Sequence, residues 1–393
     1  MVDFRALILC VPVLLFGSTF VRADFTDCLN NLRSRAISSG VNQDLFDRTV
    51  QTLEPDASVP GFLETQPEFT TPVWDYLAAL VDEERVTDGK ALLKKHAQTL
   101  AKAQSRYNVD PAVVLAVWGV ESDYGRSMGK RSIVQSLATL SCEGRRQNYF
   151  AGEFIAALKI LDGGDIQPPE LFGSWAGAFG QTQFMPSVFL STAVDLDDDG
   201  RRDVVHSIPD ALGSTANYLK VHGWTPGLIW GFEVKIPDGY DGPSGRRNKQ
   251  PMSSWAARGI VRVDGKKLGD GKAGLILPAG PQGPAFLVTT NFDTIFSYNA
   301  AESYALAIAH LADRLQGGNP FVTPWPTDDL GLARIQRREL QTLLTQRGYD
   351  IGNADGVIGT KTRQAIVQEQ TRLGFATDGH PGQRILQALR EGQ

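Results

Sequence analysis

The chain has 393 residues, which is enough for two or more folding units and a substantial core. Its formal net charge is −5, and this becomes −6 once a predicted leader containing Arg5, Arg22 and Asp3 is removed. The balance excludes the concentrated basic face of a nucleic-acid-binding protein.

Residues 1–23 resemble a secretory signal peptide, in which Arg5 precedes an apolar run over residues 6–20 and a small-residue end. The run is short for a membrane span, so an uncleaved N-terminal anchor is the weaker alternative. Cys10 lacks the small residues that precede a lipidated cysteine, so we do not expect a lipoprotein. We therefore expect a periplasmic protein with no membrane span after cleavage.

Two cysteines remain in the expected mature chain, Cys28 and Cys142. Export to an oxidising compartment allows a disulfide between them, which would tie the N-terminal segment to the region that follows. The alternative, two buried thiols that never meet, stays open from the sequence.

Helical periodicity dominates residues 24–224, for example in "ALLKKHAQTLAKAQSRY" and "NYFAGEFIAALKIL". Residues 225–290 instead contain short β-prone runs separated by glycine and proline, namely "LIWGFEVKIP", "RGIVRVDG", "AGLILPAG" and "PAFLVTT". Helix returns in "SYALAIAHLADRLQ", before a Pro/Gly linker at residues 317–328. The pattern predicts a mainly α unit with a small β subdomain.

Residues 329–393 form a separate predicted unit with an internal repeat. "DGVIGTKTRQA" from Asp355 aligns with "DGHPGQRILQA" from Asp378, with Asp, both Gly, Gln and Ala in register. A repeated Asp-Gly turn that leads into a helix predicts two similar turn–helix elements packed together. A small helical oligomerisation module is the alternative interpretation.

One carboxylate, Glu121, is predicted at the end of a buried helix. In "DPAVVLAVWGVESDYGR", Asp110 can cap the first amides and Pro111 suits the first helical position. The following residues are apolar or glycine up to Glu121, so the helix should be buried on nearly all sides. Burial would raise the pKa of this carboxyl above its reference of about 4.3, as a general acid requires. The alternative is a helix-end glutamate paired with Arg126 or Arg131.

Two further stretches carry groups that suit a sugar. "GSWAGAFGQTQFMPS" has glycines that let a backbone approach a ligand, beside the neutral side chains of Ser174, Gln181 and Gln183. In "YNAAESY", tyrosine rings can stack on a pyranose and the asparagine can bond an acetamido group. Each stretch alone is equally explained by a loop or helix face that packs into the core.

The stretch "DLDDDGRRD" matches the first half of a calcium loop, D-x-D-x-D-G. Carboxylates this close repel one another, so a cation is the simplest way to hold them in one turn. A solvated acidic turn neutralised by its arginines is the alternative. Arg201 would supply a carbonyl at position seven, and the distant Asp210 would replace the glutamate that is missing at position twelve. The predicted ligands are Asp195, Asp197, Asp199, Arg201, Asp203 and Asp210.

Together these stretches resemble the lytic murein transglycosylase B family. "GVESDYGR", "GSWAGAFGQTQFMPS", "DLDDDGRRD" and "NFDTIFSYNAAESYALAIAHLADRL" occur in the order and approximate spacing of that family, within residues 27–316. Residues 329–393 resemble the peptidoglycan-binding domain of wall hydrolases through "GYDIGNADGVIGTKTRQAI" and "LGFATDGHPG".

The resemblance implies an α+β, mainly α fold. It implies a lysozyme-like catalytic α domain at residues 24–316 with an inserted β subdomain, a linker, and a three-helix peptidoglycan-binding domain at residues 329–393. It further implies a monomer that acts on peptidoglycan glycan strands, with other wall enzymes as conceivable partners. No cofactor is implied for catalysis, and Ca²⁺ would be structural.

The implied reaction cleaves the β-1,4 bond between N-acetylmuramic acid (MurNAc) and N-acetylglucosamine (GlcNAc) for cell-wall remodelling. Glu121 matches the single catalytic acid/base of the family. Asp123 and Tyr124 replace a more usual basic residue and Trp, and Ala301 replaces a common Ser, which leaves subsite preference open. The positions that match substrate-binding groups are Tyr76, Ser174, Gln183, Tyr218, Tyr298, Asn299 and Tyr304.

Conventional glycosidases use two carboxylates, whereas Asp123, the nearest acid, should point away from Glu121 along a helix. We therefore expect Glu121 to act first as acid and then as base, while the C6 hydroxyl of the sugar closes a 1,6-anhydro ring. A lysozyme-type muramidase and a non-catalytic wall-binding scaffold are the alternatives. We expect deletion after Pro326 to weaken binding to sacculi but to spare cleavage of short soluble glycans.

Overall fold

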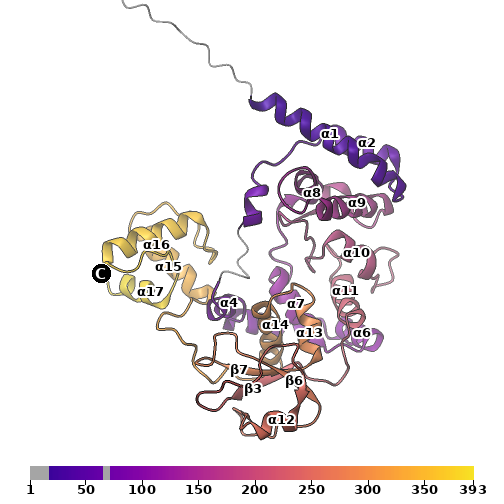
Figure 1. Cartoon of the computed structure of the whole chain (residues 1–393). Helices are drawn as coiled ribbons and strands as arrows, with labels where there is room; N and C mark the ends of the chain where they lie inside the picture. Colours follow the sequence, from indigo (N-terminus) through magenta and orange to yellow (C-terminus); the bar gives the residue numbers. More distant parts are fainter. Residues whose placement is uncertain (1–16, 65–70) are drawn as a thin grey trace, which may run out of the picture. The chain divides into compact units, whose positions relative to one another are not determined.

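The computed structural model describes residues 17–64 and 71–393, which divide into two compact units. Helices predominate, with one small five-stranded sheet (Figure 1), so the mainly α, α+β fold class is confirmed. Residues 1–16 of the predicted signal peptide lie outside the described residues. Within the described part, no helix combines the length and apolar character needed to cross a bilayer.

The first unit combines residues up to 64 with residues 129–178 and 185–187. Helix α8 packs along α9 and against α1, and the buried rings of Phe46 and Phe154 meet edge to face. A short antiparallel ladder pairs β1 with β2. The elements are α1 (Gly17–Ser38), α2 (Gln43–Gln51), η1 (Pro60–Glu64), β1 (Arg131–Ser132), α8 (Ile133–Cys142), α9 (Gln147–Gly163), η2 (Pro168–Glu170) and β2 (Phe172–Gly173).

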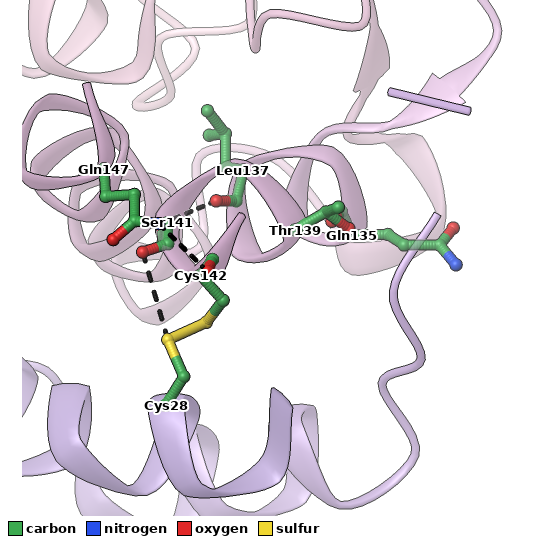
Figure 2. Close-up of a disulfide and its surroundings, with 7 residues drawn as sticks. All are labelled: Cys28, Gln135, Leu137, Thr139, Ser141, Cys142 and Gln147. Atoms are coloured by element: carbon green, nitrogen blue, oxygen red, sulfur yellow. Dashed lines mark hydrogen bonds between the residues drawn. A yellow bond between two sulfur atoms is a disulfide. The ribbon is translucent and has the colours of Figure 1, made fainter. Parts of the chain in front are cut away.

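A disulfide joins Cys28 of α1 to Cys142 at the end of α8, with an S–S distance of 2.02 Å (Figure 2). The two cysteines are 114 positions apart in the sequence. Helix α8 is held from a second side, because the Thr139 hydroxyl accepts the Asp56 N–H at 2.9 Å. The N-terminal segment of the unit is therefore fixed to α8 both covalently and by hydrogen bonding.

The second unit contains the remaining described residues, 71–128, 179–184 and 188–393. Helices α7 and α14 pack against each other at its centre, and α4, α5, α6, α11 and α13 surround them. Their bounds are α4 (Val73–Leu80), α5 (Glu83–Lys95), α6 (Ala97–Tyr107), α7 (Pro111–Ser122), α11 (Ile208–Val221), α13 (Thr290–Phe296) and α14 (Glu302–Leu315), while α10 (Pro186–Thr192) crosses the boundary between the units.

Helix α7 begins as the sequence predicts. Asp110 Oδ1 accepts the Ala112 N–H at 2.8 Å, and Pro111 is the first helical residue. Residues 112–119 are all buried, because neighbouring helices pack around α7. After Pro111, partial exposure returns only in the last turn, at Val120 and Glu121.

The five-stranded sheet is antiparallel throughout, in the order β4-β6-β7-β3-β5, and it carries α12 (Figure 1). Trp255 of α12 is fully buried against it and donates its indole N–H to Ala273 O at 2.8 Å. The four predicted β runs became β3, β5, β6 and β7, whereas β4 and α12 were not foreseen. Their bounds are β3 (Gly231–Lys235), β4 (Gln250–Pro251), α12 (Met252–Ala257), β5 (Val261–Arg262), β6 (Lys272–Ile276) and β7 (Ala285–Val288).

Residues 329–393, here called the C-terminal domain, contain α15 (Arg334–Gln346), α16 (Thr360–Leu373) and α17 (Gln383–Arg390) around a core of their own (Figure 1). The predicted repeat is visible in its hydrogen bonds. Gln341 bonds both Asp355 and the Gly356 N–H, and Gln370 bonds Asp378 and the Gly379 N–H in the same way. The two Asp-Gly turns are therefore equivalent and precede α16 and α17.

Candidate active site

Glu121 lies one residue before the end of α7, and the chain reverses directly behind it. Asp123, Tyr124 and Gly125 are all left-handed, with φ of 51°, 58° and 83°. For the two non-glycine residues this conformation costs about 1–2 kcal/mol each. The position of Glu121 therefore depends on the contacts that hold this turn.

The Tyr124 side chain anchors the turn from inside. Its ring packs edge to face on Trp118, with ring centroids 5.6 Å apart, and its hydroxyl donates to Arg85 O at 3.0 Å. The ring fits because Gly119 has no side chain, since a Cβ there would lie 2.7 Å from Tyr124 Cε1. The preceding Ser122 donates its hydroxyl to Gln181 O at 2.7 Å, which ties the helix end to the glycine-rich loop.

Asp123 is held by three arginines. Its Oδ1 accepts from Arg334 Nη2 at 2.7 Å and lies 3.3 Å from Arg85 Nη2, and its Oδ2 accepts from Arg126 Nε at 3.0 Å. Burial alone would raise the pKa of Asp123, but the bond from Arg334 and the charge of Arg85 hold it below its ordinary value. This carboxylate stays ionised, and both of its oxygens are engaged in ion pairs.

From the sequence, Arg126 and Arg131 were alternative partners of Glu121. In the structure, both arginines pair with aspartates. Arg126 contacts Asp88 at 2.7 Å besides Asp123, and Arg131 contacts Asp56 at 2.5 Å within its own unit. Glu121 instead accepts a hydrogen bond from the Tyr304 hydroxyl through its Oε1. The structure thus places Glu121 among tyrosines.

Three tyrosines adjoin one another beside Glu121. The ring centroids of Tyr218 and Tyr298 are 4.6 Å apart, and those of Tyr298 and Tyr304 are 6.3 Å apart. The Tyr298 hydroxyl donates to Thr182 O at 2.8 Å, and the Tyr218 hydroxyl donates to Ser297 O at 2.9 Å. Tyr218 and Tyr304 are buried, so here they serve as hydroxyl donors and packing partners.

Burial raises the pKa of all three tyrosine hydroxyls, and the negative charge of Glu121 raises each of them further. They therefore remain protonated across the physiological range. Glu121 therefore has a protonated tyrosine hydroxyl, that of Tyr304, as a hydrogen-bond donor, and two more protonated tyrosines lie nearby. Such a setting suits a group that gives up a proton and later takes one back.

The other predicted sugar-binding residues have different surroundings. Gln183 is left-handed at φ 49°, and its amide donates to Met128 O and Gly180 O, so it braces the glycine-rich loop. Tyr76 on α4 and Asn299 after α13 are partly exposed. Ser174 belongs to the first compact unit, where its hydroxyl accepts the Ala178 N–H at 3.0 Å.

Four of the predicted metal ligands converge. Asp195, Asp197, Asp199 and Asp210 each offer an oxygen, and these oxygens all lie within 4.8 Å of one another. Asp210 is fully buried, and burial raises its pKa to about 6. The neighbouring Asp198 turns outward and pairs with Lys102 at 2.6 Å.

Asp203, expected at position nine of the loop, is not a member of this cluster among the described residues. Its Oδ1 accepts the N–H groups of Val205 and His206, so it caps the turn that leads into α11. Arg201 donates its N–H to Asp199 Oδ1 at 2.9 Å, which shapes the loop around the cluster. Asp210, in the first turn of α11, completes the cluster because the intervening turn brings the start of α11 back beside the aspartate loop.

The three arginines that hold Asp123 were not predicted as its partners from the sequence. Two signals were present, an acidic run at residues 82–84 and the arginine-rich "RIQRR" at residues 334–338. The acidic run is ordinary at a helix start, whereas arginines there are unfavourable. Their meeting depends on tertiary structure, which neither stretch encodes locally.

Comparison with known proteins gives matches over nearly the whole chain. The family profile described as the transglycosylase SLT domain matches residues 24–313, and that of a peptidoglycan binding domain matches residues 334–389. The membrane-bound lytic murein transglycosylase B of Escherichia coli is 32% identical over 250 residues, which is 60% of this chain. The matched region spans 65% of the length of that relative.

Solved structures extend the match. SltB3 from Pseudomonas aeruginosa in complex with NAG-NAM-pentapeptide is 45% identical, with a TM-score of 0.75, covering 93% of this chain and 99% of that one. The complex of SltB3 with NAG-anhNAM-pentapeptide gives a TM-score of 0.74 at the same identity and coverage. Slt35 of Escherichia coli in complex with calcium is 29% identical, with a TM-score of 0.66, covering 76% and 95% of the two chains.

Proposed function

Because this chain belongs to the transglycosylase SLT domain family, we propose that it is a peptidoglycan lytic transglycosylase. It cleaves the β-1,4 bond between MurNAc and GlcNAc and leaves a 1,6-anhydro-MurNAc end. The predicted family resemblance is confirmed, and the relatives include lytic transglycosylases and a structure holding an anhydro sugar peptide. The observation that carries the proposal is the carboxyl of Glu121 at the end of a buried helix, where it accepts a hydrogen bond from the buried Tyr304 hydroxyl.

Glu121 serves both proton transfers. As a neutral acid it protonates the glycosidic oxygen while the bond from that oxygen to C1 of MurNAc breaks. The 2-acetamido group of MurNAc stabilises the positive charge at C1. The Glu121 carboxylate then removes the proton of the C6 hydroxyl as the C6 oxygen bonds C1. The carboxyl is regenerated and no water is consumed.

Two contacts support a single-carboxylate route. Both oxygens of Asp123 lie in ion pairs with arginines, so this residue is not available as a nucleophile or base. Tyr304 donates to one oxygen of Glu121 and so orients the carboxyl. The 1,6-anhydro product follows because the attacking oxygen belongs to the substrate itself.

The substrate groove is formed by residues that differ in role. Tyr76, Asn299 and the exposed part of Tyr298 contact sugar rings and acetamido groups, since they are partly exposed. Tyr218, Tyr304 and Gln183 support the groove from behind through the hydrogen bonds described above.

The domain boundaries that fit this function are those proposed from the sequence. Residues 1–23 form a signal peptide, residues 24–316 the catalytic domain, residues 317–328 the linker and residues 329–393 the peptidoglycan-binding domain. The disulfide is consistent with export to an oxidising compartment, and the substrate lies in the cell wall. We assign the protein to the periplasm on these grounds.

The identity of the product tests the reaction. Sacculi or a soluble GlcNAc–MurNAc oligosaccharide are digested in water enriched in heavy oxygen, and the ends are analysed by mass spectrometry. A lytic transglycosylase gives anhydro ends that are one water lighter than reducing ends and carry no heavy oxygen. Heavy oxygen at reducing ends would identify a lysozyme-type muramidase, and sacculi bound without cleavage would identify a wall-binding scaffold.

A structural calcium ion fits the four-aspartate cluster. Two oxygens bound to one Ca²⁺ at about 2.4 Å can be at most about 4.8 Å apart, and the four oxygens all lie within 4.8 Å of one another. Asp210 is fully buried beside three other carboxylates, and a bound cation would offset the free-energy cost of its buried charge. The ligands are Asp195, Asp197, Asp199 and Asp210, with the Arg201 carbonyl completing the loop. The ion holds the turn before α11 and takes no part in bond cleavage.

Chelation should lower the melting temperature by several degrees. An ion present at a hundred times its Kd stabilises the folded chain by about 2.7 kcal/mol, which chelation removes. Differential scanning calorimetry with Ca²⁺ and with EGTA measures this difference. Asp197→Asn should abolish the calcium response, whereas the matched variant Asp198→Asn, outside the cluster, should keep it. Equal melting of the wild-type protein in both buffers would contradict the site.

A further inference from the structure

Arginines at the start of α15 face acidic residues at the start of α5. Arg338 pairs with Glu84 at 2.9 Å, and Arg334 Nη1 lies 3.9 Å from the same carboxylate. Burial lowers the pKa of Arg337, whereas the nearby charge of Asp82 raises it. A basic surface of the C-terminal domain therefore docks on an acidic surface of the catalytic domain.

These arginines are poorly placed for α15 alone. A helix N-terminus carries partial positive charge and favours acidic residues. The first turn of α15 has no acidic residue, whereas Arg334, Arg337 and Arg338 occupy three of its first five positions. Arg337 donates to Gly356 O at 2.6 Å and to Leu332 O at 2.8 Å within the C-terminal domain. The carboxylates that pair with Arg334 and Arg338 belong to the catalytic domain, so docking explains these two arginines.

The pair between Arg334 and Asp123 differs from the other contacts of this interface. It is 2.7 Å long, and the side chains are only 11% and 17% exposed. The Arg338–Glu84 pair is 40% and 34% exposed, so solvent screens it more strongly. Without Arg334, the half-buried Asp123 would keep only Arg85 at 3.3 Å and the solvent-exposed Arg126, so its charge would be less well compensated and its surroundings would reorganise. Here those surroundings are the left-handed turn behind Glu121.

A second contact reaches α4. Asp75 Oδ1 accepts the Gly331 N–H at 2.8 Å, and His380 Nδ1 lies 3.5 Å from Asp75 Oδ2. The approach is close, since a Cβ on Gly331 would lie 2.7 Å from Asp75 Oδ1. Asp75 directly precedes Tyr76, a proposed sugar-binding residue. The C-terminal domain thus contacts both α4 and the end of α7.

We propose that the C-terminal domain positions the active site in addition to binding the wall, and that Arg334 is the positioning residue for Glu121. Arg334 fixes Asp123, Asp123 fixes the turn, and the turn sets the carboxyl. This inference rests on the proposed role of Glu121. It replaces the sequence-based expectation that cleavage of short soluble glycans is independent of this domain.

The test compares full-length Arg334→Met, Arg334→Lys and Arg338→Met on a short soluble glycan. Arg334→Met should lower kcat about 10-fold with KM within about twofold, because a small displacement of a reacting group costs rate rather than binding. Arg334→Lys keeps the charge and should recover most of the rate. Arg338→Met removes the exposed pair of the same interface and should keep kcat within about twofold.

Hydrogen exchange provides a second measurement that does not depend on turnover. Amides of residues 119–125 should exchange faster in Arg334→Met than in Arg338→Met, while those within α15 remain equal. Unchanged kcat and unchanged exchange in Arg334→Met would overturn the proposal. Equal losses in both variants would show a general docking effect and also overturn the role of Arg334. A wild-type protein that makes no anhydro product refutes the proposed function, while exchange still reports on the turn.

Discussion

Glu121→Gln should lower kcat on peptidoglycan by about 10³-fold or more, with little change in KM. One general acid–base group typically contributes about 10²–10⁴-fold, and in the proposed mechanism both proton transfers pass through the same carboxyl. Glutamine keeps the size and the acceptor oxygen that Tyr304 contacts, so the site should stay assembled. Initial rates of anhydro-muropeptide release, with binding to sacculi measured in parallel, separate loss of chemistry from loss of affinity.

The matched control is Glu339→Gln, which removes a carboxylate paired with Arg390 inside the C-terminal domain. It should leave turnover of a soluble glycan unchanged. If Glu121→Gln retained a tenth of the wild-type rate, another group would have to supply the acid. If it lost binding to sacculi as well, the carboxyl would be structural rather than catalytic.

Helix α7 was predictable because its signals are local. Asp110 and Pro111 define the start of α7, and the apolar run that follows can only be a buried helix. The same holds for the Asp-Gly repeat, where each turn bonds a glutamine of the preceding helix. Both features depend on residues close in sequence, so they could be predicted without tertiary information.

The surroundings of Glu121 were predictable only in part. Tyr218, Tyr298 and Tyr304 were named from the family resemblance as groove residues, but the burial of Tyr218 and Tyr304 depends on packing among distant helices. The hydrogen bond from Tyr304 to Glu121 joins residues 183 positions apart. Sequence patterns report which side chains are present, whereas their orientation is set by the packed core.

Asp123 shows the same limit for charge. We expected Asp123 to point away from Glu121 along the helix, which assumed that α7 includes Asp123. The helix instead ends at Ser122, and Asp123 turns into a left-handed residue. Arginines from two other helices, Arg85 and Arg334, then neutralise it. These ion pairs, rather than the direction of the helix, are the physical reason to propose that Asp123 is not a second catalytic acid.

Removing the disulfide should destabilise the protein by about 2–4 kcal/mol. The cysteines are 114 positions apart, and closing a loop of about 100 residues is worth about 4.7 kcal/mol in the chain-entropy description, of which native proteins realise part. Urea unfolding of Cys28→Ala/Cys142→Ala should therefore have a lower midpoint than that of the oxidised wild type. Reductant should lower the wild-type midpoint to that of the variant and should not affect the variant itself. Coincident midpoints for the variant and the oxidised wild type would contradict this prediction. In that case, the hydrogen bond between Thr139 and Asp56 and the packing of α1 on α8 would hold the N-terminal segment without the covalent link.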